Sequence, residues 1–411
     1  MRIALLHELI GDQRGMSGNA RLLLELANGL RDQAHDVVLV CHCSASAGNF
    51  DQLPGDFELR RVTDTPRQAN GRLTVLRRDW LDVRQMADLV PHDVDVVNAH
   101  DCLRAGRIAA ERLDVPLVWT RNDETKWERA IIPRRTSRGE AKLPLRAARA
   151  AFGLFDLYDA RRADAIAVLS NHDAEMVRLA YGREGRVIRL GSAERFFEPL
   201  DRPEARARLG VEGGQFLVLA VALLSPHRRF EDLLSALAML ADDDCVVGLI
   251  VGSDKFAPAY ADLLADRISR LEIGHRVTLH RTPISDIELR RHLTAADAFV
   301  FPSSRQSYGQ APLEALACGT PVIVSSGAGV HEVLAGRPGV RVVPPGRPEA
   351  IAQAIRELRA SSRDCVRPTR DWLRNELTNA GYARAMAGMF ESVCHRGVPE
   401  IGVADLAPEP G

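Results

Sequence analysis

One stretch of the sequence decides the fold around it most clearly: Phe301-Pro-Ser-Ser-Arg-Gln-Ser-Tyr-Gly-Gln-Ala-Pro-Leu-Glu-Ala-Leu-Ala-Cys-Gly-Thr-Pro-Val-Ile-Val324. It predicts an apolar strand that stops at Pro302, a polar loop, a helix and, after a Gly-Thr-Pro turn, another strand. Gly309 lets the chain pass close to a ligand, and Pro312 pre-sets the first helical turn. Free backbone amides at such a helix start favour phosphate or sugar oxygens. The stretch therefore predicts a ligand-binding loop that leads into a helix.

Short apolar runs recur along the whole chain, with helix-like segments between them. Alternation of this kind is typical of parallel sheets with crossover helices. A segment rich in Gly, Pro and polar residues divides the runs into two series, so two Rossmann-like, doubly wound α/β domains are predicted. The runs cover residues 3–6, 37–40, 94–97, 117–119, 165–168, 216–222, 246–251, 277–279, 298–301, 322–324 and 340–343.

The length of 411 residues also favours two domains, because one ordinary hydrophobic core does not grow that large. We expect an N-terminal domain over 1–190, a linker over 191–213 and a second domain over 214–370. A last helical pattern covers 371–395, and the Pro-bearing tail 396–411 is expected to be loose.

Composition and charge exclude several classes of protein. The formal net charge is −1, which argues against general nucleic-acid binding. Seven scattered cysteines without a Cys-x-x-Cys pair signal neither a disulfide framework nor a zinc site. No apolar run approaches the ~18 residues of a membrane span, and the N-terminus does not read as a signal peptide. We therefore expect a cytoplasmic protein.

The quoted stretch resembles the signature of the retaining nucleotide-sugar glycosyltransferases of GT-B family 4. Their pattern has two glutamates separated by seven residues, with an aromatic-Gly pair between them and Ala-x-Ala-x-Gly-x-Pro-Val after. Gln306 stands at the first acidic position and Glu314 at the second. The resemblance covers about residues 1–395. It implies two domains facing across a cleft, a final helix that crosses back to the N-terminal domain, and no metal or other cofactor.

The resemblance assigns donor-binding roles to this stretch. Glu314 would accept hydrogen bonds from ribose hydroxyls, and Gln306 would contact the hydroxyls of the donor sugar. Ser307, Tyr308 and Gly309 would present backbone amides to the sugar or phosphate. A first-turn glutamate also complements a helix dipole, so Glu314 has a structural interpretation as well. Further along, Glu332 resembles an acidic loop residue of the family and is a weaker candidate.

A second donor-side loop follows the strand at 216–222. The family pattern there is Gly-Arg-Leu-x-x-x-Lys-Gly, whose two cations bind the diphosphate. In this chain Leu223 occupies the arginine position, Arg228 the lysine position and Arg229 the glycine position. Guanidinium groups bind phosphate with two hydrogen bonds. Positive charge at the start of a helix is unfavourable because the helix dipole is positive there, and a bound anion would offset this cost. Arg228 and Arg229 are therefore predicted to bind the donor.

The N-terminal half offers two further sites at strand ends. The loop 7–21 lacks a Gly-x-Gly-x-x-Gly fingerprint, which disfavours an NAD enzyme, but it resembles the family's glycine loop with Gly18 as the best-matched residue. An ordinary strand-to-helix connection is the alternative. His100 aligns with a histidine near the transferred sugar in the family. Asn122 and Asp123 follow the next strand and are candidates on the acceptor side.

The basic, apolar stretch 131–155 could dock on an anionic membrane surface. A solvated helix face with one buried side explains the same pattern, and we favour that interpretation. Localisation is therefore expected to be cytoplasmic, with peripheral contact to the inner membrane face as the alternative.

Together these features predict a metal-independent hexosyltransferase. It would move a sugar from a nucleotide diphosphate donor to an unidentified acceptor hydroxyl, with retention implied by the resemblance alone. Arg228 would offset charge on the leaving diphosphate while His100 and the Gly18 loop orient sugar and acceptor. Two alternatives remain open at this stage: a nucleotide-sugar 2-epimerase on the same scaffold, and a non-catalytic sugar-nucleotide-binding protein.

Overall fold

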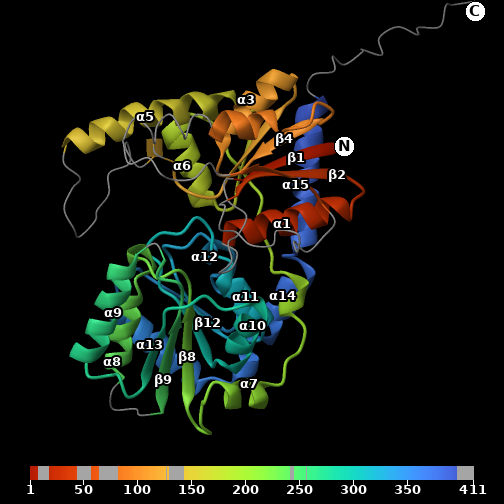
Figure 1. Cartoon of the computed structure of the whole chain (residues 1–411). Helices are drawn as coiled ribbons and strands as arrows, with labels where there is room; N and C mark the ends of the chain where they lie inside the picture. Colours follow the sequence, from red (N-terminus) through yellow and green to blue (C-terminus); the bar gives the residue numbers. More distant parts are fainter. Residues whose placement is uncertain are drawn as a thin grey trace, which may run out of the picture.

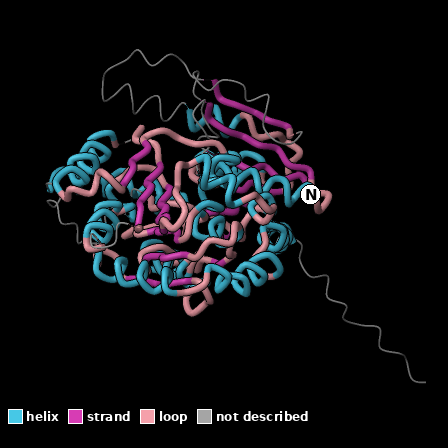
Figure 2. Tube along the Cα trace, turned by 90° about the horizontal axis from the view of Figure 1, so that it is seen from below, coloured by secondary structure: helices cyan, strands magenta, loops and turns pink. Residues whose placement is uncertain are grey.

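Two lobes, each built around one parallel sheet, make up the computed structural model of the chain (Figure 1). The structure describes residues 1–7, 18–43, 57–63, 82–125, 127–128, 143–240, 245–255 and 257–395. The predicted pair of doubly wound α/β domains is confirmed. Seen from below, helices flank the strands, and some strands lie at the margin of the molecule (Figure 2).

The N-terminal sheet has seven strands in the order β3-β2-β1-β4-β5-β6-β7. They are β1 (Arg2–His7), β2 (Asp36–Cys43), β3 (Glu58–Thr63), β4 (Val96–Ala99), β5 (Leu117–Arg121), β6 (Ala165–Val168) and β7 (Arg186–Val187). The sequence did not predict β3 or β7. Because β3 lies at the edge of the sheet and carries charged residues, it lacks the apolar run of a central strand.

The C-terminal sheet has six strands in the order β10-β9-β8-β11-β12-β13. They are β8 (Phe216–Val221), β9 (Val246–Val251), β10 (Val277–His280), β11 (Ala298–Phe301), β12 (Val322–Ser325) and β13 (Val340–Val343). The stretch 301–324 therefore contains the end of β11, a loop, helix α11 (Ala311–Ala317) and most of β12, as predicted.

Helices cover the faces of both sheets (Figure 1). The N-terminal lobe carries α1 (Gly18–Arg31), α3 (Leu103–Leu113), α5 (Leu143–Arg162) and α6 (Asn171–Tyr181). The C-terminal lobe carries α8 (Phe230–Ala238), α9 (Pro258–Arg270), α10 (Asp286–Ala295), α11, α12 (His331–Leu334) and α13 (Pro348–Ala360). In the described part of the chain, no helix is both long and apolar enough to span a bilayer.

Two segments differ in detail from the predicted pattern. The stretch 191–213 is not irregular throughout, since it contains helix α7 (Arg202–Arg208), whose start is capped by the Asp201 side chain. The last helical pattern is split into α14 (Arg367–Asn375) and α15 (Asn379–Cys394). The Thr378 side chain caps α15 by accepting from the amide of Gly381 at 2.9 Å, which starts a new helix there.

Helix α15 crosses α1 of the N-terminal lobe and packs against it, although it follows the C-terminal lobe in sequence (Figure 1). An added Cβ at Gly29 of α1 would come within 2.5 Å of the Cβ of Ala383 of α15, so the two helices are in close contact. Buried Tyr382, Met386 and Phe390 join the same hydrophobic core as α1. The end of the chain thus links the two lobes.

Strand register brings the polar ends of the N-terminal strands to one edge. Leu6 of β1 pairs with Ala99 of β4, and Ala99 pairs with Trp119 of β5. Side chains that directly follow these pairs therefore stand side by side at the carboxyl edge of the sheet. Ligands of open parallel sheets bind at this edge.

Candidate functional site

The N-terminal wall of the candidate site is a cluster of buried polar side chains at the carboxyl edge of the sheet. Asn98, His100 and Asn122 are each at most 3% exposed. Asn98 donates through Nδ2 to the carbonyl of Val118 at 3.0 Å and to the hydroxyl of Thr120 at 2.9 Å. Hydrogen bonds between neighbouring strands thus fix the positions of this wall.

His100 is held by Asn122, whose Nδ2 lies 3.0 Å from its Nδ1. When the amide donates, Nδ1 is the acceptor and the ring proton sits on Nε2. Burial, followed by the nearby His7 ring, lowers the pKa of His100 well below its usual value, so the ring is neutral. The buried Nε2 has no hydrogen-bond partner within the described residues. The ring can therefore donate one hydrogen bond to a ligand.

The C-terminal wall is formed by the loops after β8 and β11. Residues Pro226–Arg228 form the short 3-10 helix η3, and the amide of Ser304 donates to the carbonyl of His227 at 2.9 Å. Ser303, two residues after the end of β11, is fully buried. Backbone contact between the two loops therefore makes them one surface.

Arg228 projects from this surface as a partly desolvated cation. Its guanidinium lies 5.5 Å from the ring centroid of Phe301, and its Nη1 lies 3.5 Å from the hydroxyl of Ser303. Burial lowers its pKa to about 10, against the opposing effect of the Asp123 carboxylate. The group stays charged at neutral pH, and its buried Nε has no partner among the described residues. A cation so placed suits an anionic ligand.

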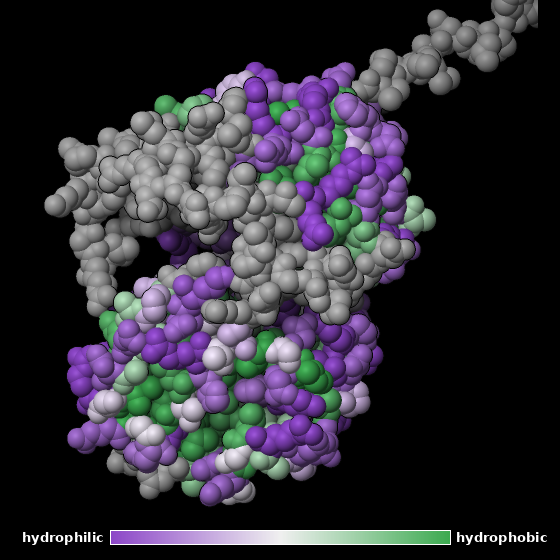
Figure 3. Space-filling model, in the orientation of Figure 1, coloured by the Kyte–Doolittle hydropathy of each residue, from purple (hydrophilic) through white to green (hydrophobic). Residues whose placement is uncertain are grey.

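Asp123, which directly follows Asn122 on the N-terminal side, is close enough to Arg228 that its carboxylate opposes the lowering of the Arg228 pKa. Next to it, a Glu124 carboxylate oxygen lies 2.9 Å from Nη1 of Arg305 across the same junction. Figure 3 shows a hollow between the lobes, with hydrophilic residues where described surface is visible. Of the predicted residues, His100 is therefore hydrogen-bonded to Asn122, and Asp123 lies near enough to Arg228 to interact with its charge.

Arg229, the neighbour of Arg228, points elsewhere. Its Nε and Nη2 donate to the two carboxylate oxygens of Asp232 at 2.5 and 2.8 Å. Its φ of 54° lies in the left-handed region, which suits the glycine of the family pattern at this position. Leu223, which stands at the family's arginine position, is exposed. Arg228 is thus the better placed of the two predicted cations.

The predicted donor loop packs closely against both lobes. Tyr308 is buried, and its hydroxyl donates to the carbonyl of Leu190 at 2.9 Å. Gly309 has a φ of +110°, and an added Cβ would lie 2.9 Å from the ring of Phe301, so the protein itself requires glycine there. Gln306 is half-buried, and its backbone pairs with the segment around Ala328. No hydrogen bond joins its side chain to another described residue, which leaves the amide available.

Glu314 lies in the first turn of α11 and faces α1 of the other lobe. One of its carboxylate oxygens is 3.0 Å from Nη2 of Arg21, and burial raises its pKa. Beside it lies a cavity of about 20 Å³, room for roughly one water molecule. The structure therefore pairs Glu314 with Arg21 at the interlobe junction.

Among the residues that join the lobes beside the donor loop, the sequence singled out Ser307 and Glu332 but did not indicate Asp173 or Arg121. Asp173 of α6 accepts hydrogen bonds from Arg121 and from Ser307, and Glu332 of α12 accepts from the start of α6. One signal was present: Ser170-x-x-Asp173 before an amphipathic run is a helix-capping pattern. No local signal indicates a partner more than 100 residues away.

Several predicted features lie wholly or partly outside the described residues. Gly18 is described as the first residue of α1, but the loop 8–17 before it is not. Of the basic stretch 131–155, only the part from residue 143 is described, as helix α5 with exposed Leu154 and Phe155. The tail 396–411 also lies outside.

Comparison with known families gives matches in both lobes. The family described as Glycosyltransferase Family 4 matches residues 16–191, and the family described as Glycosyl transferases group 1 matches residues 201–375. Between them, the two matches include every candidate residue described above.

Individual proteins of known sequence or structure match as well. The chain is 32% identical to D-inositol 3-phosphate glycosyltransferase of Geodermatophilus obscurus, over 75% of this chain and 66% of that protein. It is 30% identical to the enzyme of that name from Streptomyces bingchenggensis, over 84% and 72%. The match thus spans just under two thirds of the first relative's length. In structure the chain is similar to Anabaena Alr3699/HepE in complex with UDP-glucose, with a TM-score of 0.73, 21% identity and coverage of 95% and 100%.

Proposed function

The chain belongs to glycosyltransferase family 4, the group 1 glycosyl transferases, and on this basis we propose that it transfers a hexose-type sugar from a nucleotide diphosphate sugar to an acceptor hydroxyl. The proposal rests mainly on the environment of the Arg228 guanidinium. The buried Nε of this cation has no partner among the residues that the structure describes, and the charge of Asp123, the neighbour of Asn122, acts on it from the N-terminal lobe. A diphosphate beside Arg228 would place the attached sugar toward His100.

The chemistry follows from charge. As the bond between sugar and diphosphate breaks, negative charge grows on the leaving phosphate oxygens, and a preorganised guanidinium stabilises it. The neutral His100 ring donates from Nε2 to a sugar hydroxyl and so orients the donor. The side-chain amide of Gln306 contacts another hydroxyl. We propose retention at the anomeric carbon from family membership, and NMR of the product anomer tests it.

The first experiment should identify the donor. Because a structural neighbour binds UDP-glucose, UDP-sugars are the first donors to test, followed by other nucleotide sugars in a thermal-shift screen. Donor consumption then separates the candidate functions. Acceptor-dependent transfer supports the proposal, acceptor-independent isomerisation indicates an epimerase, and binding without turnover indicates a non-catalytic protein. Full activity in EDTA is expected, because we assign charge stabilisation to Arg228.

Two substitutions test the donor loop. Gln306→Ala should lower donor turnover, since a neutral hydrogen bond contributes about 0.5–1.5 kcal/mol net. Glu314→Ala should weaken nucleotide binding measured by calorimetry, because we propose that the carboxylate exchanges Arg21 for ribose hydroxyls. Wild-type donor kinetics and affinity in both variants would exclude this assignment.

The acceptor and the cellular location are proposed only in outline. The names of the matched relatives contain D-inositol 3-phosphate. Inositol phosphates are therefore the first compounds to test as acceptors. Contact of the 131–155 stretch with an anionic membrane remains the alternative to a solvated helix. Liposome co-sedimentation tests it, and binding that weakens with salt would support membrane contact.

A further inference from the structure

The start of helix α6, in the N-terminal lobe, is bonded to the C-terminal lobe. Glu332 of α12 accepts hydrogen bonds from the amides of Asn171 at 2.8 Å and His172 at 3.0 Å. These amides belong to the first turn of α6, where helix N–H groups lack partners within the helix. A carboxylate from the other lobe therefore completes the cap that Ser170 begins.

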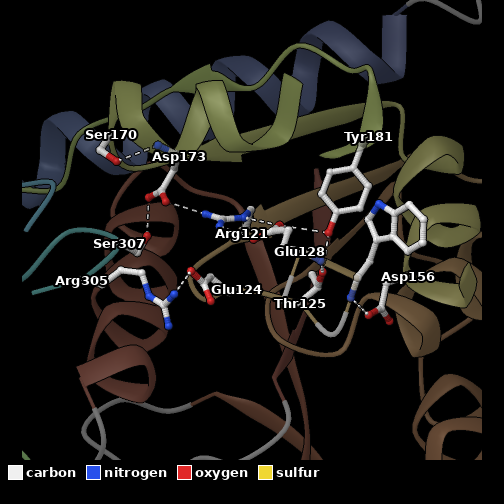
Figure 4. A network of polar contacts seen from close by, with 11 residues as sticks. Arg121, Glu124, Thr125, Glu128, Asp156, Ser170, Asp173, Tyr181, Arg305 and Ser307 are labelled. Carbon is white, nitrogen blue, oxygen red and sulfur yellow. Dashed lines mark hydrogen bonds and ion pairs between the residues drawn. The ribbon is translucent and has the colours of Figure 1, made fainter. Parts of the chain in front are cut away.

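Asp173, in the same turn of α6, joins the two lobes by its side chain. One carboxylate oxygen accepts from Nη1 of Arg121 at 2.6 Å, and the other accepts from the hydroxyl of Ser307 in the donor loop (Figure 4). Asp173 is only 2% exposed. Hydrogen bonds to a buried carboxylate are charge-assisted and roughly twice as strong as neutral ones.

Arg121 lies between Asp173 and Glu128 and is bonded to both carboxylates (Figure 4). Its Nε and Nη2 donate to the two oxygens of Glu128 at 2.8 and 2.6 Å, and the Tyr181 hydroxyl donates to Glu128 at 3.0 Å. Arg121 and Glu128 are both almost fully buried. Glu128 therefore holds Arg121, and Arg121 in turn holds the carboxylate that accepts from the Ser307 hydroxyl.

Packing at the same point leaves no room for a side chain. An added Cβ at Gly329 would lie 2.0 Å from the carbonyl oxygen of Ser307 and 2.7 Å from the Cβ of Ser170 in the other lobe. We call the residues at this contact the docking cluster: Arg121, Glu128, Ser170, Asp173, Ser307, Gly329 and Glu332.

Contacts with the N-terminal lobe hold the donor loop on both sides of Gln306. Arg305, before Gln306, is paired with Glu124, and Ser307, after it, is bonded to Asp173. Tyr308 adds the hydrogen bond to the Leu190 carbonyl. Gln306 is thus flanked by side chains that are each bonded to the N-terminal lobe.

We propose that Asp173 is a positioning residue for the reaction: through Ser307 it holds the donor loop, and with it Gln306, against the N-terminal lobe. The proposal rests on the proposed function, because it assigns the loop to the donor sugar. A loop displaced by about 1 Å would lose orientation of the sugar and slow transfer by up to roughly a hundredfold.

Hydrogen exchange measured by mass spectrometry tests the docking without any substrate. Asp173→Asn should speed exchange of the amides in 303–309, and Ser307→Ala should speed exchange of the Asn171 and His172 amides in the other lobe. Asp173→Asn keeps the side-chain volume and leaves Arg121 paired with Glu128. Peptides of α13 serve as an internal reference. Exchange at wild-type rates across the junction in both variants would overturn the proposal.

Donor kinetics test the positioning. Asp173→Asn and Ser307→Ala should each lower kcat/KM for the donor about tenfold, and the double variant should be no worse than the poorer single one. Ser307→Thr keeps the hydroxyl and should restore most activity. Glu175→Gln, on the exposed face of α6, is the matched control and should behave as wild type.

The outcomes are distinct. Faster exchange with unchanged kcat/KM, or additive losses in the double variant, would overturn the positioning role. If the wild-type protein consumes no nucleotide sugar, the proposed function fails, while the exchange data still decide whether Asp173 docks the lobes.

Discussion

Two groups of buried polar side chains meet at the junction of the lobes, and they differ in how their hydrogen bonds are satisfied. In the docking cluster, the guanidinium of Arg121 is bonded to two carboxylates, and Asp173 in turn accepts from Ser307. At the candidate site, Nε2 of His100 and Nε of Arg228 are buried without a partner in the described part of the chain.

This difference indicates that the two groups of buried polar side chains have different roles. A buried donor without a partner costs about 1–3 kcal/mol, so proteins rarely keep one unless a ligand or water completes it. A satisfied network instead fixes one arrangement of the parts it joins. The docking cluster therefore holds the lobes together, and His100 with Arg228 is the pair that we propose a ligand completes.

The largest effect is expected from Arg228. Arg228→Met keeps the stem over Phe301 and removes the charge, and it should lower kcat for the donor about a hundredfold or more, as loss of a preorganised charge-stabilising donor does. The melting temperature should change little, because the guanidinium has few partners to lose. Near wild-type turnover would show that Arg228 binds no part of the donor that matters for the reaction.

The docking cluster should respond differently to Gly329→Ala. The added methyl must displace the Ser307 backbone or Ser170, so we expect about a tenfold loss in kcat/KM together with a lower melting temperature. Gly388→Ala is a matched control, because an added Cβ there meets nothing within 4 Å and alanine favours the helix. Equal behaviour of the two variants would contradict the tight contact.

The dependence of stability on pH tests whether His100 is buried as a neutral ring. Its folded pKa lies well below the ~6.5 of an unfolded histidine, so the unfolded chain binds more protons as pH falls below 6.5. The resulting loss of stability on acidification cannot exceed about 1.4 kcal/mol per pH unit for one group. Denaturant melts at pH 7.5 and 5.5 should show a smaller loss for His100→Asn than for wild type. Equal losses would mean that His100 is not buried as a neutral ring.

The smallest effect is expected from Arg229. Arg229→Gly removes a partly exposed ion pair with Asp232, worth about 0–1 kcal/mol, and relieves a left-handed backbone. Donor kcat/KM should therefore fall by no more than about fivefold. A loss as large as that of Arg228→Met would show that Arg229 also binds the donor.

Much of the fold could be predicted because its signals are local. Apolar runs at regular spacing indicate buried parallel strands and mark their carboxyl ends, and the family resemblance singled out His100 and Asn122 at two of these ends. Edge strand β3 was missed because its charged residues do not alternate as a buried strand does. The break before α15 was missed because it depends on a single capping threonine.

The sequence by itself determined the two-sheet architecture, the position of the signature loop between β11 and α11, and the family, since each depends on the order of residues along a short segment. Only the tertiary structure decided between Arg228 and Arg229, paired Glu314 with Arg21, and joined Asp173 to Ser307. The physical reason is distance. A hydrogen bond forms only within about 3 Å, and packing of two whole domains sets which groups from distant segments come that close.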